Sequence, residues 1–426
     1  MNPSLPAPGT RARVLMVVEN EGYPDDTRIR VEALALTAAG YDVTVIAPNF
    51  DRGPSAETID GIRVRRYPPP PRGAGLWAYL GEYLVATAVS LVMVLRAMVA
   101  EGVDVVHLHN PPDTLWVAAL PARLVGKRVI FDHHDLAPEL YGAIYGPRAR
   151  GIVRWALLLL ERVSFRLADH VISTNESYRE VAINRGRVPT RRISVVRNGP
   201  DLERVRLVAP DADLRARAGT IVGYVGLMAK QDGVDRLLHA VRHLVHELGR
   251  RDVLFMLIGY GDELEELKRL AGELEIEQWV WFTGRISDDE LLMRYLSTAD
   301  LCVTPDPATP YTEHSTMIKM MEYMALGKAI VAFDMRENRA SGGDAAVYVP
   351  GNDSEAFAQA IAELMDDPAR RAEMGGVGRK RVEAGLSWAH SVPHLLASYE
   401  AVLSNQPRRL FRRNSRRSPS HGVVDR

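Results

Sequence analysis

Short apolar runs alternate with longer segments of helical periodicity over most of the chain. The runs that predict strands are Val14–Val18, Val43–Ala47, Val103–His109, Arg128–Asp132, His170–Thr174, Ile193–Arg197, Thr220–Gly226, Val253–Gly259, Val280–Thr283, Leu301–Thr304 and Ala329–Phe333. The main segments with helical spacing are Thr27–Ala39, Leu76–Ala100, Val153–Leu167, Val234–Leu248 and Asp262–Leu274. Strands that are apolar throughout and separated by helices are typical of parallel sheets covered on both faces. The pattern therefore predicts an α/β fold.

The alternation restarts after a polar stretch at Pro200–Gly219, and 426 residues are too many for one ordinary core. We predict two doubly wound, Rossmann-like domains facing a cleft, one at 13–205 and one at 215–386. Ligands of such sheets bind beyond the carboxyl ends of the strands, so the cleft is the expected site. Three further segments complete the predicted layout: a flexible N-terminus at 1–12, a C-terminal helix packing back towards the first domain at 387–404, and a disordered basic tail at 405–426.

The composition excludes some classes of protein. The chain has 53 Lys and Arg against 54 Asp and Glu, so it lacks the basic surplus of a nucleic-acid binder. Its one cysteine, Cys302, leaves no partner for an internal disulfide and fits a reducing compartment. The N-terminal residues lack the apolar stretch of a secretory signal. We therefore expect a cytoplasmic protein, with peripheral contact at the inner membrane face as a further expectation.

Two segments bear on that membrane contact. The apolar segment Leu76–Ala100 is interrupted by Glu82 and Arg96, and the stretch between them is shorter than the ~18 residues of a spanning helix. It predicts either a core helix or a helix that lies on a membrane surface. The arginines of the tail at 405–426 predict either a solvated tail or a weak tether to anionic lipid.

The strongest chemical signal is the stretch Glu313–Lys328, which follows a predicted strand. Ser315 or Thr316 is a good helix N-cap, and helix-forming residues run from there to a stop at Gly327. A helix that starts just after a strand aims its free backbone N–H groups into the cleft, where they can bind a diphosphate. The carboxylate of Glu322, about two turns into this helix, can accept hydrogen bonds from ribose hydroxyls.

This stretch resembles the donor-binding motif of retaining glycosyltransferase family four, which has the GT-B fold. The family motif has two glutamates separated by seven residues, and Met321–Ala332 (MEYMALGKAIVA) matches its second half. The resemblance extends over roughly 13–404, and it implies that 13–205 is the acceptor domain and 215–386 the nucleotide-sugar domain. It implies that Glu322 binds the donor ribose. It also implies that the amides of Met317 and Ile318 face the diphosphate, helped by Ser315 and Thr316.

The first glutamate of the motif is displaced in this chain. The position eight residues before Glu322 is His314, and Glu313 stands one place earlier. The resemblance therefore leaves Glu313, as a catalytic residue, and His314, as a donor-binding residue, as alternatives for the contact with the donor sugar.

A second departure lies in the glycine turn after the first strand of the second domain, Gly226–Gly233. The family has Arg after the first glycine and Lys before the last one, and this chain has Leu227 and Asp232 there. The resemblance implies that Gly226 approaches the donor. Lys230 is the cation that remains in the turn, and we predict that it faces the leaving diphosphate.

Three further landmarks of the family concern the loops of both domains. The stretch Phe282–Ile286 resembles the loop that reads the nucleobase, which makes Arg285 a donor-binding candidate. His109, at a strand end of the first domain, matches the family's catalytic histidine near the reacting sugar. His134 and Asp135 match the acceptor side, and Gly22 matches a turn that approaches the donor diphosphate. The family requires neither metal nor cofactor, so we expect none.

Taken together, these residues predict transfer of a sugar from a nucleoside diphosphate sugar to an acceptor, with retention at the anomeric carbon. The expected acceptor is a glycan or a lipid-linked glycan. Two alternatives stay open on the sequence: a non-hydrolysing nucleotide-sugar epimerase, and a catalytically inactive nucleotide-sugar-binding protein, which Leu227 and Asp232 would favour.

Overall fold

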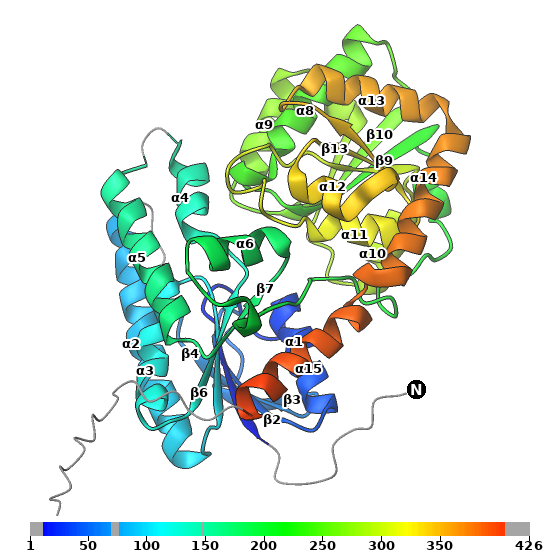
Figure 1. Ribbon diagram of the computed structural model, residues 1–426. Helices are drawn as coiled ribbons and strands as arrows, with labels where there is room; N and C mark the ends of the chain where they lie inside the picture. The colour runs from blue at the N-terminus through cyan, green and yellow to red at the C-terminus, as the bar shows by residue number, and fades with distance from the viewer. Residues whose placement is uncertain (1–11, 70–75, 147–148, 405–426) are drawn as a thin grey trace, which may run out of the picture.

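The computed structural model describes residues 12–69, 76–146 and 149–404, and it shows two α/β domains (Figure 1). The segment predicted to be a flexible N-terminus, except for Ala12, and the predicted basic tail both lie outside the described residues. Each domain holds one sheet with helices on both faces, so the predicted fold class is confirmed.

The first domain contains an eight-stranded sheet in the order β3-β4-β2-β1-β5-β6-β7-β8. Only β3 is antiparallel to its neighbour. Its strands are β1 Arg13–Val17, β2 Asp42–Pro48, β3 Ala56–Ile59, β4 Ile62–Tyr67, β5 Val105–His109, β6 Arg128–His133, β7 His170–Ser173 and β8 Ile193–Val195. Its helices are α1 Thr27–Ala38, α2 Leu76–Ala100, α3 Trp116–Leu124, α4 Ala137–Tyr145, α5 Gly151–Leu167 and α6 Glu176–Asn184.

The second domain contains a six-stranded sheet, parallel throughout, in the order β11-β10-β9-β12-β13-β14. Its strands are β9 Thr220–Leu227, β10 Val253–Tyr260, β11 Val280–Gly284, β12 Leu301–Thr304, β13 Ala329–Phe333 and β14 Ala346–Val349. Its helices are α7 Ala212–Arg215, α8 Val234–Arg242, α9 Leu264–Glu273, α10 Asp289–Thr298, α11 Ile318–Ala325, α12 Arg336–Gly342, α13 Ser354–Asp366 and α14 Pro368–Arg381.

The strands that the apolar pattern did not predict are the β3–β4 hairpin, at one side of the first sheet, and β14, at an edge of the second. The β3–β4 hairpin turns at Asp60 and Gly61, which both have positive φ (52° and 81°). An Asp-Gly pair is a strong signal for such a turn. The flanking strands were missed because they alternate apolar with charged residues, and only part of each faces the core. The other strand that was not predicted, β14, is only four residues long, which makes its apolar pattern short.

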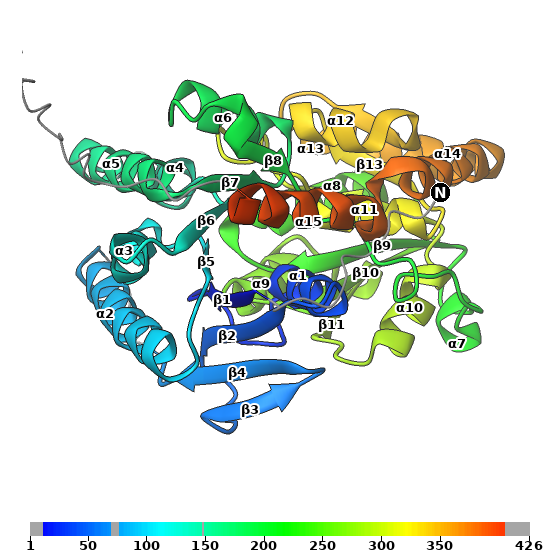
Figure 2. The same ribbon diagram turned by 60° about the horizontal axis from the view of Figure 1, so that its bottom comes forward.

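The last helix, α15 Trp388–Ser404, crosses from the second domain to the first. It lies beside α1 in both views of the ribbon (Figures 1 and 2). Leu395, Tyr399 and Val402 are buried in the core that α1 shares with the sheet. The Tyr399 hydroxyl lies 2.8 Å from Nδ1 of the buried His107 on β5. The C-terminal segment therefore stabilises the first domain.

This packing predicts that Leu395→Ala lowers the free energy of unfolding by about 2–5 kcal/mol, because Leu395 is fully buried and its loss leaves a cavity. Leu403 lies on the same helix with 38% of its surface exposed, so Leu403→Ala is expected to change stability by less than about 0.5 kcal/mol. Urea unfolding monitored by circular dichroism measures both. Equal effects of the two substitutions would contradict the docking of α15.

Candidate active site

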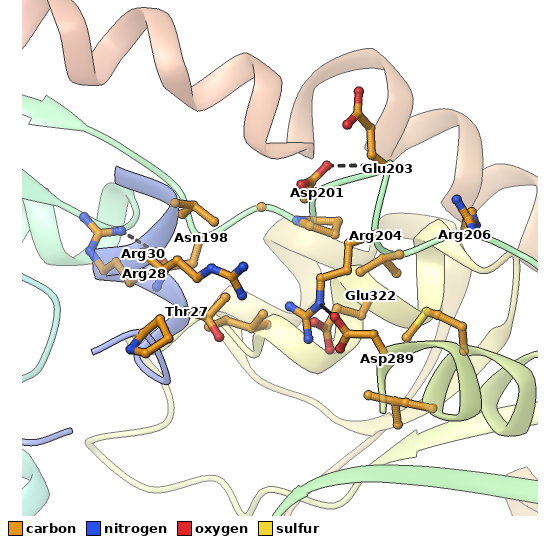
Figure 3. A pocket seen from close by; sticks show the side chains of 18 of the residues that line it. Thr27, Arg28, Arg30, Asn198, Asp201, Glu203, Arg204, Arg206, Asp289 and Glu322 are labelled. Atoms are coloured by element: carbon orange, nitrogen blue, oxygen red, sulfur yellow. Dashed lines mark hydrogen bonds and ion pairs between the residues drawn. The ribbon is translucent and has the colours of Figure 1, made fainter. Parts of the chain in front are cut away.

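A cavity of about 800 Å³ opens between the two domains. Three parts of the chain line it: the β1–α1 loop with α1, the interdomain segment 198–208, and the second-domain residues after β11 and on α10 and α11. Figure 3 shows Arg204 of the interdomain segment close to Asp289 and Glu322 of the second domain in this space. A cavity of this size between two domains suits a substrate the size of a nucleotide sugar.

The helix α11 begins at the cavity, one or two residues later than predicted. Its N-cap is Met317, with no side-chain hydrogen bond, so the predicted capping by Ser315 or Thr316 is wrong. Within the described residues, the backbone amides of Met317, Ile318 and Lys319 donate no hydrogen bond. Ile318 lines the cavity and is 40% exposed. This unsatisfied amide end carries the partial positive charge of the helix dipole.

Glu322 lies on the same face of α11 as Ile318 and also lines the cavity. Burial raises the pKa of its carboxyl group, while the guanidinium of Arg204 counteracts that effect. Arg204 comes from the interdomain segment and donates to Asp289 of α10 at 3.0 Å. Figure 3 shows Arg204 directed towards both acids. The predicted ribose-binding residue thus faces the cavity beside an arginine that the sequence analysis did not identify.

The hydroxyls of Ser315 and Thr316 are engaged across the domain gap. Tyr178 of α6 lies 3.1 Å from Ser315 Oγ, which donates to the backbone of Tyr311. The Asn175 side chain donates to Thr316 Oγ1 at 2.9 Å and to the His314 carbonyl at 2.8 Å. In this structure both hydroxyls hold the two domains together, and their predicted contact with a diphosphate stays a prediction.

The two alternatives for the displaced glutamate both lie beside the cavity rather than on its wall. A carboxylate oxygen of Glu313 accepts from the backbone amide of Arg336, at the start of α12, at 3.1 Å. Nδ1 of His314 lies 3.0 Å from the Pro310 carbonyl. Neither residue belongs to the cavity lining. The structure therefore favours neither of them as the contact to the donor sugar.

The turn after β9 brings Gly226 next to α11. A Cβ on Gly226 would lie 3.3 Å from Cε of Lys319 and 2.8 Å from the Tyr224 hydroxyl, so glycine permits this close approach. Lys230 is mostly exposed, with 71% of its side chain accessible, and lies 4.0 Å from Glu263. The structure thus places a different lysine, Lys319, beside the turn.

Arg285 follows β11 and lines the cavity. Its guanidinium lies 5.0 Å from the centre of the Tyr260 ring and 3.7 Å from Asp25 of the first domain. Gly22 lies earlier in the same β1–α1 loop as Asp25, but it is buried against Pro48 and Phe50 and does not line the cavity.

His109, the predicted catalytic histidine, is fully buried in this structure. Its ring lies 4.1 Å from that of His107, and its Nδ1 lies 3.6 Å from Asp132. Burial lowers the pKa of His109 well below its usual range, so the imidazole is neutral at pH 7. Contact with a substrate would require its covering residues to move, and its catalytic role stays a prediction.

His107, His109, Glu32 and Asp132 form a buried group with the spacing of metal ligands. The guanidinium of Arg28 lies 2.7 Å from Asp132 and 3.0 Å from Glu32. This cation already neutralises the carboxylates, so the group fits a buried ion-pair network better than a metal site.

The predicted acceptor-side residues lie together at the end of β6. The side-chain oxygen of Asn110 accepts from the amides of both His134 and Asp135, at 2.9 and 3.1 Å. His134 Nδ1 lies 3.3 Å from Asp132. The carboxylate of Asp135 accepts from the hydroxyl of Tyr311 of the second domain at 2.8 Å. These two residues therefore lie where the domains meet.

Both halves of the chain match known protein families. Residues 26–199 match the glycosyl transferase 4-like domain, and residues 219–367 match the glycosyl transferases group 1. Sucrose-phosphate synthase from Thermosynechococcus elongatus has the same fold, with a TM-score of 0.75 at 22% identity over 92% of this chain and 99% of that chain.

Characterised relatives agree with the family matches. D-inositol 3-phosphate glycosyltransferase 1 of Catenulispora acidiphila is 28% identical over 82% of this chain and 83% of its own length. A GDP-mannose-dependent alpha-(1-6)-phosphatidylinositol monomannoside mannosyltransferase of Mycolicibacterium smegmatis is 27% identical over 75% of this chain and 93% of its own length. These relatives give no support to an epimerase or an inactive binding protein. The chain belongs to the GT-B glycosyltransferases that combine a glycosyl transferase 4-like domain with a glycosyl transferases group 1 domain and use nucleotide sugars.

Proposed function

We propose that this protein transfers a sugar from a nucleoside diphosphate sugar to a lipid-linked glycan at the cytoplasmic face of a membrane, with retention at the anomeric carbon. One observation supports the donor half above all: the amide end of α11 and the carboxylate of Glu322 share one cavity between the domains. The amides suit the negative charge of a diphosphate, and the carboxylate suits the hydroxyls of a ribose.

The proposed chemistry relies on charge stabilisation at the amide end of α11. Negative charge develops on the diphosphate as the sugar leaves, and fixed backbone dipoles in a partly closed cavity stabilise that charge without rearranging. Retention is proposed from the resemblance to family four. We also propose that no metal takes part, because Arg28 neutralises the one buried group with metal-ligand spacing among the described residues.

An exposed apolar face supports a lipid-linked acceptor. Among the described residues one helix, Gly81–Ala100, is long and apolar enough to cross a membrane, with a mean hydropathy of 2.0, and 28% of it is buried. It belongs to α2, which packs on α3 and β1 as a covering helix of the first domain. The helices α2, α3 and α5 all carry exposed apolar side chains, and the three helices lie together in both views (Figures 1 and 2). Among these side chains are Leu84, Val92, Leu95, Val99, Leu124, Val125, Ile152, Trp155 and Leu159.

The charges around this face, here called the α2–α5 face, suit an anionic membrane. Arg96 is exposed on α2, and Arg154, Arg162 and Arg166 are exposed on α5. Apolar side chains flanked by arginines are typical of a surface that inserts shallowly between lipid headgroups. The mycobacterial relative that acts on a phosphatidylinositol mannoside makes a lipid acceptor a reasonable proposal.

Glu322→Gln is expected to weaken binding of the cognate nucleoside diphosphate by about 10- to 100-fold, because a neutral amide replaces a charged acceptor of ribose hydrogen bonds. A thermal-shift screen of UDP, GDP and ADP identifies the base by the rise in melting temperature, and titration calorimetry measures the loss. Glu290→Gln is the matched control, since Glu290 is an exposed acid at the same cavity. Unchanged affinity in Glu322→Gln would remove the proposed donor site.

Replacing Ile152 and Trp155 together by serine is expected to lower binding to phosphatidylglycerol vesicles about tenfold, because 74% and 63% of these side chains are exposed and available for insertion. Added salt is expected to weaken the binding further. Co-sedimentation measures the bound fraction, with Leu207→Ser as control because Leu207 is 58% exposed on the interdomain segment. Equal binding of wild type and the double variant would contradict the membrane contact.

A further inference from the structure

The turn after β9 presents no cation of its own to a diphosphate. Leu227 ends the strand with 49% of its surface exposed, and Asp232 precedes Gly233. Lys230 extends into solvent, where Glu263 is its nearest acid. Positive side-chain charge for a diphosphate at the start of α11 must therefore come from another element.

Lys319, the second residue of α11, supplies a charge at this place. Its Cε lies 3.3 Å from the position of a Cβ on Gly226, and its Nζ lies 4.9 Å from the centre of the Tyr224 ring. Only 11% of the side chain is exposed. Burial alone would lower the pKa of Lys319, but Asp306, Tyr224 and Asp232 raise it above the usual value, so the ammonium stays charged.

Lys319 and Glu322 are three residues apart on the same short helix, so they are neighbours on its surface. Burial raises the pKa of the Glu322 carboxyl group, and the ammonium of Lys319 lowers it. Ile318 and Glu322, four residues apart, line the cavity, whereas Lys319 is directed towards the turn after β9. The unsatisfied amides of Met317, Ile318 and Lys319 belong to the same end of the helix. A nucleotide whose ribose contacts Glu322 can thus extend its phosphates over the amide end towards the ammonium.

Two acids lie close to the Lys319 ammonium and leave some of its N–H donors free. Asp306 accepts from Lys319 Nζ at 2.9 Å, and Asp232 lies at 3.7 Å. An ammonium has three N–H donors, so the bond to Asp306 leaves two. Among the described residues, Oδ2 of each acid has no hydrogen-bond partner. An incompletely satisfied buried cluster next to a ligand site is more typical of function than of stability.

Asp232 gives the cluster a sensitivity to pH. The groups that face it are Lys319 of α11, Asp306 after β12 and Tyr224 of β9. Burial raises the pKa of Asp232 to about 6, with Lys319 lowering it and Asp306 raising it. Above that pH its carboxylate is ionised and repels a neighbouring phosphate, and below it the repulsion disappears.

We propose that Lys319 binds the donor diphosphate and stabilises it as it leaves, that Asp306 positions the ammonium, and that ionised Asp232 weakens the site. The inference rests on the proposed donor site. In the transfer, the bond between the anomeric carbon and the β-phosphate oxygen breaks, and its electron pair goes to that oxygen. A bond from the acceptor oxygen forms, the acceptor's proton passes to the departing phosphate, and Lys319 keeps its own proton.

The test compares each nucleoside diphosphate, UDP, GDP and ADP, with its monophosphate by titration calorimetry on the full chain. Lys319→Met is expected to lower affinity for the diphosphate about 10- to 100-fold and to lower the ratio of diphosphate to monophosphate affinity by a similar factor, while the amide end of α11 keeps part of the preference. Glu322→Gln is expected to lower both affinities in proportion. Lys230→Met tests the rival cation. If Lys230→Met lost the preference for the diphosphate and Lys319→Met kept it, the proposal would be overturned.

A second pair of variants separates binding from structure. Lys319→Met combined with Asp306→Asn removes both partners of the ion pair. This double variant is expected to be more stable to unfolding than Lys319→Met alone, but not to regain the diphosphate preference. Recovery of that preference in the double variant would show that Lys319 acts only as a partner of Asp306. If wild type bound none of the nucleotides, the proposed function would fail together with the inference. If Glu322→Gln weakened binding and Lys319→Met left the ratio unchanged, the inference alone would fail.

The role of Asp232 is tested by pH. Asp232→Asn is expected to raise diphosphate affinity several-fold at pH 7.5 relative to wild type, and the difference is expected to vanish at pH 5.5, where Asp232 is mostly protonated. Comparing the two proteins at each pH cancels the protonation of the phosphate itself. Lower affinity in Asp232→Asn at pH 7.5, or a difference that persists at pH 5.5, would contradict the proposed repulsion.

Discussion

The side chain of Asn175 holds the two halves of the site in one geometry. It caps α6 by accepting from the amide of Tyr178 at 2.7 Å, and it donates to the backbone of His314 and the hydroxyl of Thr316 in the other domain. These bonds fix the loop that leads directly into α11. The direction of that loop sets where α11 begins and whether its amide end faces the cavity. This matters because the effect of the helix dipole falls off within the first turn. The proposed donor site therefore depends on an interdomain contact.

The same loop connects the donor side with the acceptor side. Tyr311 donates to Asp135, which stands beside His134 at the end of β6, and burial raises the pKa of that carboxyl group. A group that binds at Asp135 competes with Tyr311 for the same carboxylate oxygens. Since Tyr311 is joined to Ser315 through its backbone, such competition acts on the approach to α11. Two sites that share one hydrogen-bonded loop are thermodynamically linked.

The parts of the structure that could be predicted from the sequence are those set by local pattern. The strand β10, Val253–Tyr260, is predictable because both its faces are buried and its residues are apolar throughout. The position of Glu322 follows from helical spacing. Ser315 was assigned as an N-cap because that preference is local, whereas its actual partner, Tyr178, is far away in the chain. Lys319 was missed because its proximity to the turn after β9 exists only in the folded protein.

The departures at Leu227 and Asp232 raised the alternative of an inactive binding protein, and the proposed role of Lys319 would remove the reason for it. Stabilisation of a leaving diphosphate depends on the potential at the place where charge develops, and not on which element carries the cation. In this chain a buried ammonium on α11 reaches the turn that lacks one, and a carboxylate pair holds it there. Placing the cation on the helix that also supplies the amides and Glu322 would join the three proposed donor contacts in a single rigid element. Such a site keeps its geometry whenever the helix is formed.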